Sequence, residues 1–261
     1  MHDVVNKEGL RREALPQGEA GAAGGIWPIA LEDLRFAVGG KTLLDGLSLT
    51  LTPGSRSVVM GPNGAGKSLF LRLLAGLLQP TSGKITYGGR TGDAATLRRI
   101  AVVFQRPVML RRSVAANLKH ALATYGVPRR ERAGQIRELL QLAQLEALAD
   151  RPARVLSGGE QQRLAMVRAL GAKPELLLLD EATASLDPQA TAAIEALIGQ
   201  ASAKGVKIVM VTHDRGQAQR LADEVLFFHR GRLAERCEAA TFFNRPSSAA
   251  AQAYLEGRLL L

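Results

Sequence analysis

The chain has 261 residues, of which 46% are hydrophobic and 22% charged, a composition typical of a soluble globular protein with room for one large domain. Its apolar stretches fall short of the roughly 18 residues that a membrane-spanning helix needs, and the first 25 residues lack the apolar core of a secretory signal. The single cysteine, Cys237, excludes an internal disulfide and a cysteine-only zinc site.

The formal charge is +10, and the excess is concentrated in one window. Between Arg98 and Arg137, ten lysine and arginine residues stand against one acidic residue, Glu131. A local basic face can contact nucleic acid, anionic lipid headgroups or a partner protein, and it can also be a solvated surface without a partner. Composition leaves these interpretations open.

The elements predicted in chain order describe an α/β fold. Residues 1–27 predict a mobile tail, the main domain is expected over 28–240, and 241–261 form a C-terminal extension. Residues 113–170 are almost entirely helical in pattern. The remaining strands are predicted at 31–38, 47–52, 56–60, 99–104, 176–180, 207–213 and 224–229, and the remaining helices at 67–78, 188–200 and 215–223.

Apolar strands that alternate with helices predict a mostly parallel sheet with helices on both faces. The first two strands, joined by a glycine-containing turn, predict an antiparallel portion near the N-terminus. The long helical block interrupts the alternation, so we expect an inserted α-helical subdomain over about residues 106–160.

The octapeptide GPNGAGKS at 61–68 fits the pattern G-x-x-x-x-G-K-[ST] and stands between a predicted strand and a predicted helix, as a phosphate-binding loop requires. Glycines let the backbone curl around phosphate, and the following helix presents its positive end. Lys67 supplies a cation for the β- and γ-phosphates of a nucleoside triphosphate, and the Ser68 hydroxyl can bind Mg²⁺. The nucleotide-binding residues expected here are Gly61, Pro62, Asn63, Gly64, Ala65, Gly66, Lys67, Ser68 and Leu69.

Two carboxylates follow the apolar strand 176–180. Asp180 at its end is suited to hold Mg²⁺, and Glu181 directly after it is suited to orient or deprotonate the attacking water. Taken alone, an Asp-Glu pair at a strand end is as often a cap of the next turn. The phosphate-binding loop upstream favours the catalytic interpretation, and the fold class becomes a P-loop NTPase core.

A second glycine-rich helix start, LSGGEQQRLA, lies at 156–165. Ser157 and Glu160 form the S-x-x-E pattern of a capping box, which explains both residues structurally. Gly158 and Gly159 remain unexplained by the cap, since each glycine at a helix start costs about 1 kcal/mol relative to alanine. Bare backbone is useful where an anion must approach closely.

With LSGGEQQRLAMVRAL the sequence closely resembles the ATP-binding cassette family. The other motifs that carry the resemblance follow in order and cover about residues 30–235: GPNGAGKS, VFQRP with Gln105, LLLLDEAT, SLD with Asp187, and VTHD with His213. The resemblance implies a head-to-tail dimer in which Ser157, Gly158 and Gly159 of one copy contact the ATP held by the other.

The resemblance also assigns roles outside the phosphate-binding loop. It places Gln105 beside Mg²⁺ and the γ-phosphate, at the junction with the helical subdomain, and Asp187 at the contact between the two copies. His213 is expected to hold the γ-phosphate and the attacking water. Glu181, His213 and Gln105 are thus the expected catalytic residues, and Ser68, Gln105 and Asp180 the expected Mg²⁺ ligands.

The sequence departs from the family pattern at two places. The aromatic residue that stacks on adenine in similar proteins is replaced by Val38, and Phe36 on the same strand either substitutes for it or leaves adenine stacking weak. Leu69 stands where a threonine is common, so a hydroxyl contact to phosphate is lost.

The family resemblance implies an ATPase subunit that works at the cytoplasmic face of the membrane with integral-membrane permease subunits and a substrate-binding protein. The expected system is a bacterial importer of a small anion of the tungstate, molybdate or phosphate type. Alternatives are an exporter, an amino-acid importer, or a non-transport ATPase acting on nucleic acid, although no nucleic-acid partner is expected. Arg106, Arg111 and Arg112 are interpreted as a face for a partner or for lipid headgroups.

Overall fold

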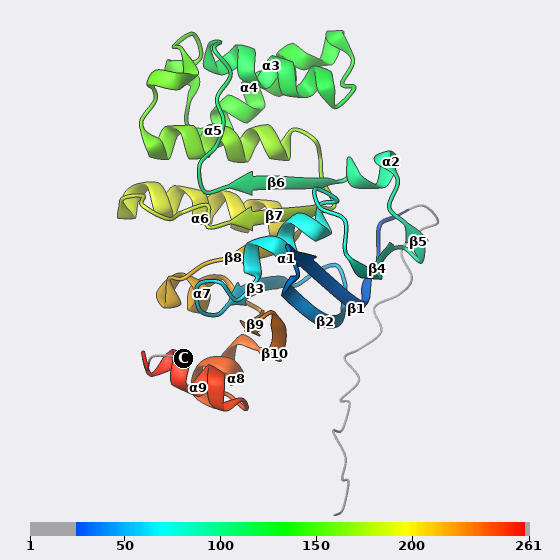
Figure 1. Cartoon of the computed structure of the whole chain (residues 1–261). Helices are drawn as coiled ribbons and strands as arrows, with labels where there is room; N and C mark the ends of the chain where they lie inside the picture. Colours follow the sequence, from blue (N-terminus) through cyan, green and yellow to red (C-terminus); the bar gives the residue numbers. More distant parts are fainter. Residues whose placement is uncertain (1–24, 259–261) are drawn as a thin grey trace, which may run out of the picture.

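A computed structural model describes residues 25–258, and its centre is a six-stranded sheet with the strand order β10-β9-β3-β8-β7-β6 (Figure 1). Neighbouring strands are parallel except β10, which is antiparallel to β9. The predicted parallel sheet is therefore confirmed. The strands are β3 (Arg56–Met60), β6 (Ile100–Phe104), β7 (Leu176–Asp180), β8 (Lys207–Val211), β9 (Glu224–His229) and β10 (Arg232–Glu238).

Side chains of this sheet alternate between two apolar layers. Leu177 and Leu179 of β7 belong to one hydrophobic cluster, and Leu176 and Leu178 belong to the other. Both clusters are covered, so every residue of β7 is buried. Because both faces of the strand need apolar side chains, a continuous apolar run is what such a strand requires.

The helices around the sheet divide between these layers. Side chains of α1 (Lys67–Leu74) belong to the same cluster as Leu176, and α6 (Pro188–Ala203) and α7 (Arg215–Leu221) contribute to the cluster of Leu177. The short helix α2 (Ala94–Leu97) has no buried residue. Within the described part of the chain, no helix has the length and apolar character of a membrane span.

An antiparallel sheet with the order β2-β1-β4-β5 packs on the side of α1. Its strands are β1 (Ile29–Val38), β2 (Lys41–Leu51), β4 (Ser82–Tyr87) and β5 (Arg90–Thr91). The antiparallel portion was predicted, but the predicted turn between its first two strands is too long. Residues 41–46 pair with β1 instead, and β4 and β5 were not predicted at all.

The predicted helical block consists of α3 (Val114–Thr124), α4 (Arg129–Ala143) and α5 (Gly158–Leu170), with short 3-10 turns at Glu146–Leu148 and Ala153–Val155. Figure 1 shows these helices stacked together at one end of the molecule, beyond β6. The inserted subdomain thus lies beside the edge strand of the parallel sheet. Its chain ends pass directly into β6 and β7.

Both ends of the described chain are packed. Ile26 is 1% exposed, and its N–H donates to Oε2 of Glu175 at 3.2 Å, so the tail boundary predicted at residue 27 is too late. The rest of the predicted tail, residues 1–24, lies outside the described residues. At the other end, α8 (Ala239–Asn244) and α9 (Ala249–Leu255) lie opposite the helical subdomain (Figure 1). The boundary predicted at 240 falls inside α8, whose Phe242 is fully buried.

Candidate nucleotide-binding site

The loop between β3 and α1 has the backbone of a phosphate cradle. Gly61, Gly64 and Gly66 have φ angles of 141°, 78° and 98°, a region that residues with a side chain rarely adopt. A Cβ at Gly61 would overlap the carbonyl oxygen of Phe228, and one at Gly66 would overlap the side chain of Leu44. Glycine is therefore needed for the loop to form.

Lys67 occupies the first position of α1 and reaches back over this loop. Its Nζ donates to the carbonyl oxygens of Gly61 at 2.8 Å and Pro62 at 2.9 Å, and the residue is 6% exposed. Burial lowers the pKa of Lys67, while the nearby carboxylates of Glu181 and Asp180 oppose that shift. The ammonium group is thus held where a phosphate chain entering the cradle would meet it.

The remaining residues predicted for the cradle line it at different depths. Asn63 is exposed, Pro62 and Leu69 are half-buried, and Ala65 is buried in the core. Leu69 packs against the same cluster, so the residue that replaces the usual hydroxyl has a packing partner.

Ser68 and Asp180 place two side-chain oxygen atoms beside the cradle. Ser68 Oγ donates to Asp180 Oδ1 at 2.8 Å, and Asp180 is 7% exposed at the end of β7. Hard cations such as Mg²⁺ prefer carboxylate and hydroxyl oxygens of this kind. The pair therefore fits Mg²⁺.

Gln105 is exposed and directly follows β6, at the sheet edge where Asp180 ends β7, since Phe104 pairs with Asp180. A residue that the sequence reasoning missed supports this edge. Gln162 of α5 is 2% exposed, and its Nε2 donates to the carbonyl oxygen of Phe104 at 3.1 Å. It links the second glycine-rich helix to the residue before Gln105. In the sequence, Gln162 is the second glutamine of GGEQQ, which is the pattern that could have identified it.

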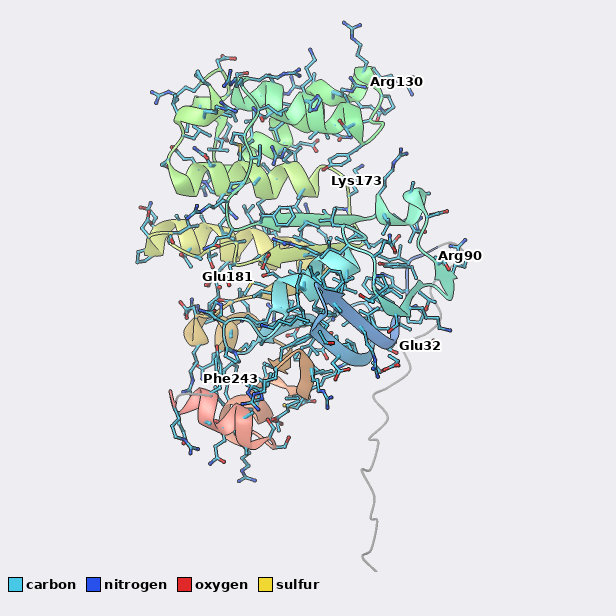
Figure 2. All side chains as sticks on the ribbon, viewed as in Figure 1. Glu32, Arg90, Arg130, Lys173, Glu181 and Phe243 are labelled. Atoms are coloured by element: carbon cyan, nitrogen blue, oxygen red, sulfur yellow. The ribbon has the colours of Figure 1, made fainter. Side chains whose placement is uncertain are left out.

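Glu181 and His213 are brought into contact at the ends of adjacent parallel strands. His213 Nε2 lies 2.8 Å from Glu181 Oε1, and Glu181 has a φ of 52°. A left-handed backbone in a residue with a side chain is strained, and such strain concentrates at functional sites. Figure 2 labels Glu181 between the helical subdomain, where Arg130 is labelled, and the C-terminal helices, where Phe243 is labelled. The carboxylate and the imidazole form one unit beside Asp180.

The second glycine-rich helix start is a capping box, as predicted. Ser157 Oγ accepts from the N–H of Glu160 at 3.3 Å, and the N–H of Ser157 donates to Glu160 Oε2 at 2.7 Å. The hydrogen bonds from Ser157 hold the pKa of Glu160 below its ordinary value. Ser157 and Gly158 are exposed.

The two glycines of this helix start differ. A Cβ on Gly159 would lie 2.7 Å from the Cβ of Ala190, whereas one on Gly158 would meet only Leu186 at 3.9 Å. The cap leaves both glycines unexplained, but packing against the start of α6 accounts for Gly159. Asp187 likewise has a role within the chain, since its Oδ1 caps α6 by accepting from the N–H of Ala190 at 2.8 Å.

The exposure of two residues on β1 shows which side chain is accessible to an adenine base. Phe36 is 9% exposed and belongs to the core, while Val38 is 59% exposed. At the register shift between Phe36 and Ala37 the extra residue is Leu43 of β2, and Val38 is exposed because it ends β1. Phe36 is unavailable for stacking.

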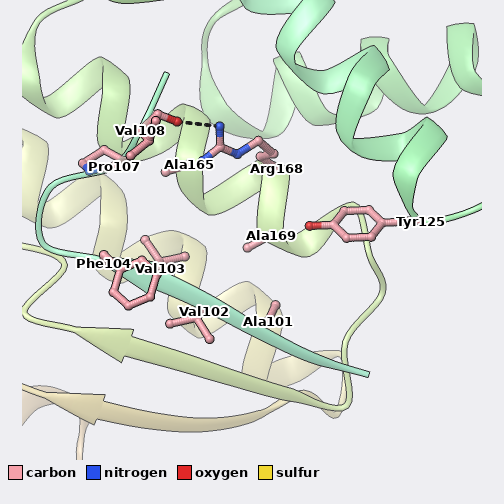
Figure 3. Close-up of a pocket in the computed structure, with 10 residues that line it drawn as sticks. All are labelled: Ala101, Val102, Val103, Phe104, Pro107, Val108, Tyr125, Ala165, Arg168 and Ala169. Atoms are coloured by element: carbon pink, nitrogen blue, oxygen red, sulfur yellow. Dashed lines mark hydrogen bonds between the residues drawn. The ribbon is translucent and has the colours of Figure 1, made fainter. Parts of the chain in front are cut away.

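A groove with an apolar lining lies between β6 and the helical subdomain (Figure 3). Its exposed apolar residues are Phe104, Val108 and Tyr125, and Arg168 crosses it to donate from Nη1 to the Val108 carbonyl oxygen at 2.9 Å. Arg106, Arg111 and Arg112, predicted as a partner face, are exposed on the adjoining loop.

That loop is fixed by a buried amide. Asn117 is fully buried, and its Oδ1 accepts from the N–H of Leu110 at 3.0 Å while its Nδ2 donates to the carbonyl oxygen of Ser113 at 2.9 Å. The arginines therefore extend from an ordered backbone.

The cradle, the adjacent oxygen ligands and the carboxylate–imidazole pair define a P-loop nucleoside triphosphatase. A family model described as ABC transporter matches residues 44–184. The chain is 39% identical over 209 residues to the tungstate uptake system ATP-binding protein TupC of Peptoclostridium acidaminophilum, covering 79% of this chain and 97% of that protein.

Two further relatives and one solved structure agree. The chain is 35% identical to an Fe(3+) ions import ATP-binding protein of Pasteurella multocida, covering 84% of this chain and 64% of the relative. It is 34% identical to a phosphate import ATP-binding protein of Mycoplasmoides gallisepticum, covering 90% and 77%. A solved ATP-binding subunit of an ABC transporter superposes with a TM-score of 0.77 at 25% identity, over 88% of this chain and 98% of that one.

This chain belongs to the ABC transporter family. It is an ATP-binding, ATP-hydrolysing subunit of such a transporter.

Proposed function

We propose that this subunit powers a bacterial importer of a small anion of the tungstate, molybdate or phosphate type. The observation that carries the proposal is the similarity to the tungstate uptake protein, which extends over 97% of that protein at 39% identity. A phosphate import protein is also among the relatives. Iron is the alternative cargo, because an iron import protein is also among the relatives. This chain covers a smaller share of that relative's length, 64%.

The residues of the site have separate roles in ATP hydrolysis. Lys67 balances the charge of the β- and γ-phosphates, and Glu181 orients and deprotonates the attacking water. His213 holds the Glu181 carboxylate at 2.8 Å and lies at the same edge for contact with the γ-phosphate. Ser68, Asp180 and Gln105 would hold Mg²⁺. When bound, this ion neutralises charge that develops on the transferred phosphoryl group.

The proposed active form is a head-to-tail dimer of two copies. Ser157 and Gly158 are exposed at the start of α5, where the N–H groups of a helix favour an anion. Their own helix start has no lysine comparable to Lys67. In the dimer these residues contact the γ-phosphate of the ATP in the partner copy, and Asp187 at the start of α6 lies beside the dimer contact.

We propose that the groove of Figure 3 receives the permease at the cytoplasmic face of the membrane. Val108 is 74% exposed on its rim, and the loop that follows presents Arg111 and Arg112. An apolar hollow with a basic rim suits a short amphipathic helix of a membrane-embedded partner. A substrate-binding protein would deliver the anion to that permease.

The cargo can be tested in cells of the source organism that lack the gene and carry a plasmid copy of either the wild type or Lys67→Ala. Tungsten, molybdenum, phosphorus and iron accumulated from limiting medium are measured by mass spectrometry. We expect the wild type alone to restore one of the oxyanions, with iron equal in both strains. Restoration of iron alone would overturn the anion class, and equal accumulation of all four elements would overturn import of these ions.

A further inference from the structure

The C-terminal helix α9 is anchored at its start by a buried carboxylate. Glu235 of β10 is 7% exposed and accepts hydrogen bonds from the N–H groups of Ser247 at 2.8 Å and Ser248 at 2.9 Å. Burial would raise the pKa of Glu235, but these hydrogen bonds outweigh it and hold the pKa below its ordinary value. Ser248 then caps α9 by accepting from the N–H of Ala251 at 3.1 Å.

Aromatic contacts fix α9 against the strand next to the phosphate-binding loop. The ring of Phe227 in β9 lies 5.7 Å from Phe242 of α8 and 5.3 Å from Tyr254 of α9. Phe227 pairs with Met60, the residue that precedes Gly61. The C-terminal helices therefore pack beneath the point where the cradle begins, and Figure 1 shows them beside α7 and β9.

The end of α9 contacts two segments of the catalytic site. Burial raises the pKa of Tyr254, and the backbone of Gly61 beside its hydroxyl opposes that rise. One residue later, the carbonyl oxygen of Leu255 accepts from Arg215 Nη1 at 3.2 Å. Arg215 starts α7, two residues after His213, and its guanidinium carbon lies 6.0 Å from the centre of the Phe243 ring.

We propose that Tyr254 and Arg215 are positioning residues for ATP hydrolysis, through which α9 fixes the first residue of the phosphate-binding loop relative to the segment that carries His213. Neither residue needs to touch ATP for this role. The two act on different steps, because Gly61 belongs to the cradle that binds phosphate and His213 contacts Glu181. The proposal for Arg215 rests on the role proposed for His213.

This division predicts a split in the kinetics of two conservative variants. Tyr254→Phe keeps the ring on Phe227 and removes only the hydroxyl beside the backbone of Gly61, so we expect KM for ATP to rise about 3- to 10-fold with kcat within about twofold of the wild type. Arg215→Gln releases the start of α7, so we expect kcat to fall about 3- to 10-fold with little change in KM. Both melting temperatures should stay within about 2 °C of the wild type.

Two variants elsewhere serve as matched controls. Tyr87→Phe removes a phenol hydroxyl that donates to the carbonyl oxygen of Leu74 at 2.8 Å, at the far end of α1 from the cradle, and Arg245→Gln removes an exposed arginine that follows α8. Both should keep wild-type kcat and KM in the isolated subunit. Glu181→Gln is measured in parallel. If the catalytic site is wrongly assigned, Glu181→Gln keeps its turnover. That outcome is distinct from any effect of Tyr254→Phe on KM.

The proposal is overturned if Tyr254→Phe and Arg215→Gln match their controls in both constants. It is also overturned if each variant only loses kcat in proportion to a loss of folded protein with KM unchanged, which is the pattern of a general structural role.

Discussion

Two helices of this protein begin beside glycines, and they do so for different reasons. At α1 the backbone demands glycine, with φ angles of 141° at Gly61 and 98° at Gly66 and neighbours that leave no room for a Cβ. At α5 the two glycines have ordinary backbone angles, a side-chain cap is present, and only Gly159 is crowded. Lys67 is the first residue of α1, whereas the first turn of α5 has no basic residue.

The comparison shows that glycines at a helix start do not define a nucleotide site on their own. At α1 the candidate site also includes groups at the ends of other strands, namely Asp180, Glu181 and His213. At α5 the exposed Ser157 and Gly158 remain incomplete within one chain, which is the geometry expected of a half-site. The predictions below test whether the two helix starts differ in this way.

The largest effect is expected from Glu181→Gln. The variant keeps the cradle intact but loses the carboxylate proposed to deprotonate the attacking water, so turnover should fall by about 10²- to 10⁴-fold while ATP affinity is retained. Phosphate release and the equilibrium binding of ATP are measured on the same preparation. Glu138→Gln, a matched change at an exposed position of α4, should behave as the wild type. Undiminished turnover in Glu181→Gln would mean that another group activates the water.

Lys67→Ala should remove ATP binding itself, because the loop then lacks the cation that balances phosphate charge. Mg-ATP at 100 times its dissociation constant stabilises a protein by about 2.7 kcal/mol, so the wild type should show a clear rise in melting temperature. The variant should show almost none. Lys204→Ala, at an exposed lysine after α6, provides the control. An unchanged thermal shift in Lys67→Ala would contradict the assignment of α1 as the phosphate site.

Mixing two inactive subunits tests whether the α5 start serves a second copy. Lys67→Ala destroys the cradle and Ser157→Arg blocks the helix start, so each homodimer lacks any intact site. A heterodimer of the two has one site with both features intact and should regain ATPase activity. The subunits carry different tags so that heterodimer formation is proven. Proven heterodimers without activity would count against independent composite sites.

The paired variants Gly158→Ala and Gly159→Ala separate packing from function. Gly159→Ala places a methyl 2.7 Å from the Cβ of Ala190, so denaturant unfolding should show a loss of about 1–3 kcal/mol. Gly158→Ala meets only Leu186 at an ordinary contact distance of 3.9 Å and should leave stability equal or higher by up to about 1 kcal/mol. Its ATPase activity should nevertheless fall, because a side chain then stands where the nucleotide of the partner approaches. Full activity in Gly158→Ala would reduce this segment to a helix cap.

Much of the fold could be predicted because its signals are local. The strands β3, β7 and β9 match their predictions residue by residue, since buried parallel strands are short apolar runs between turn residues. The strand β4 has no such signal, because most of its residues are exposed or half-buried and its position is set by pairing with β1, about 50 residues earlier in the chain. The C-terminal helices likewise depend on Phe227 and Glu235 rather than on their own pattern.

The candidate site divides in the same way. Its residues could be found from motif spacing, because phosphate chemistry demands particular residue types at fixed positions. The contacts between them could not be predicted. The hydrogen bond of Glu181 with His213, the packing of Gly159 on Ala190 and the support from Gln162 arise only when distant segments meet.

The smallest effect is expected at the adenine base of ATP. Neither glycine-flanked helix start is proposed to bind this base, since both are proposed to contact phosphates. The hairpin of β1 and β2 lies beside the cradle, since Leu44 contacts Gly66, and Val38 near its tip is 59% exposed. An aromatic ring adds about 0.5–1.5 kcal/mol when it stacks, so Val38→Tyr should tighten ATP binding about 2- to 10-fold. Calorimetry in the Glu181→Gln background measures this without turnover, and Val38→Ile is the control for added size. An unchanged dissociation constant would place the base away from this hairpin, and nucleotide affinity would then come from the phosphate contacts of Lys67 and its loop.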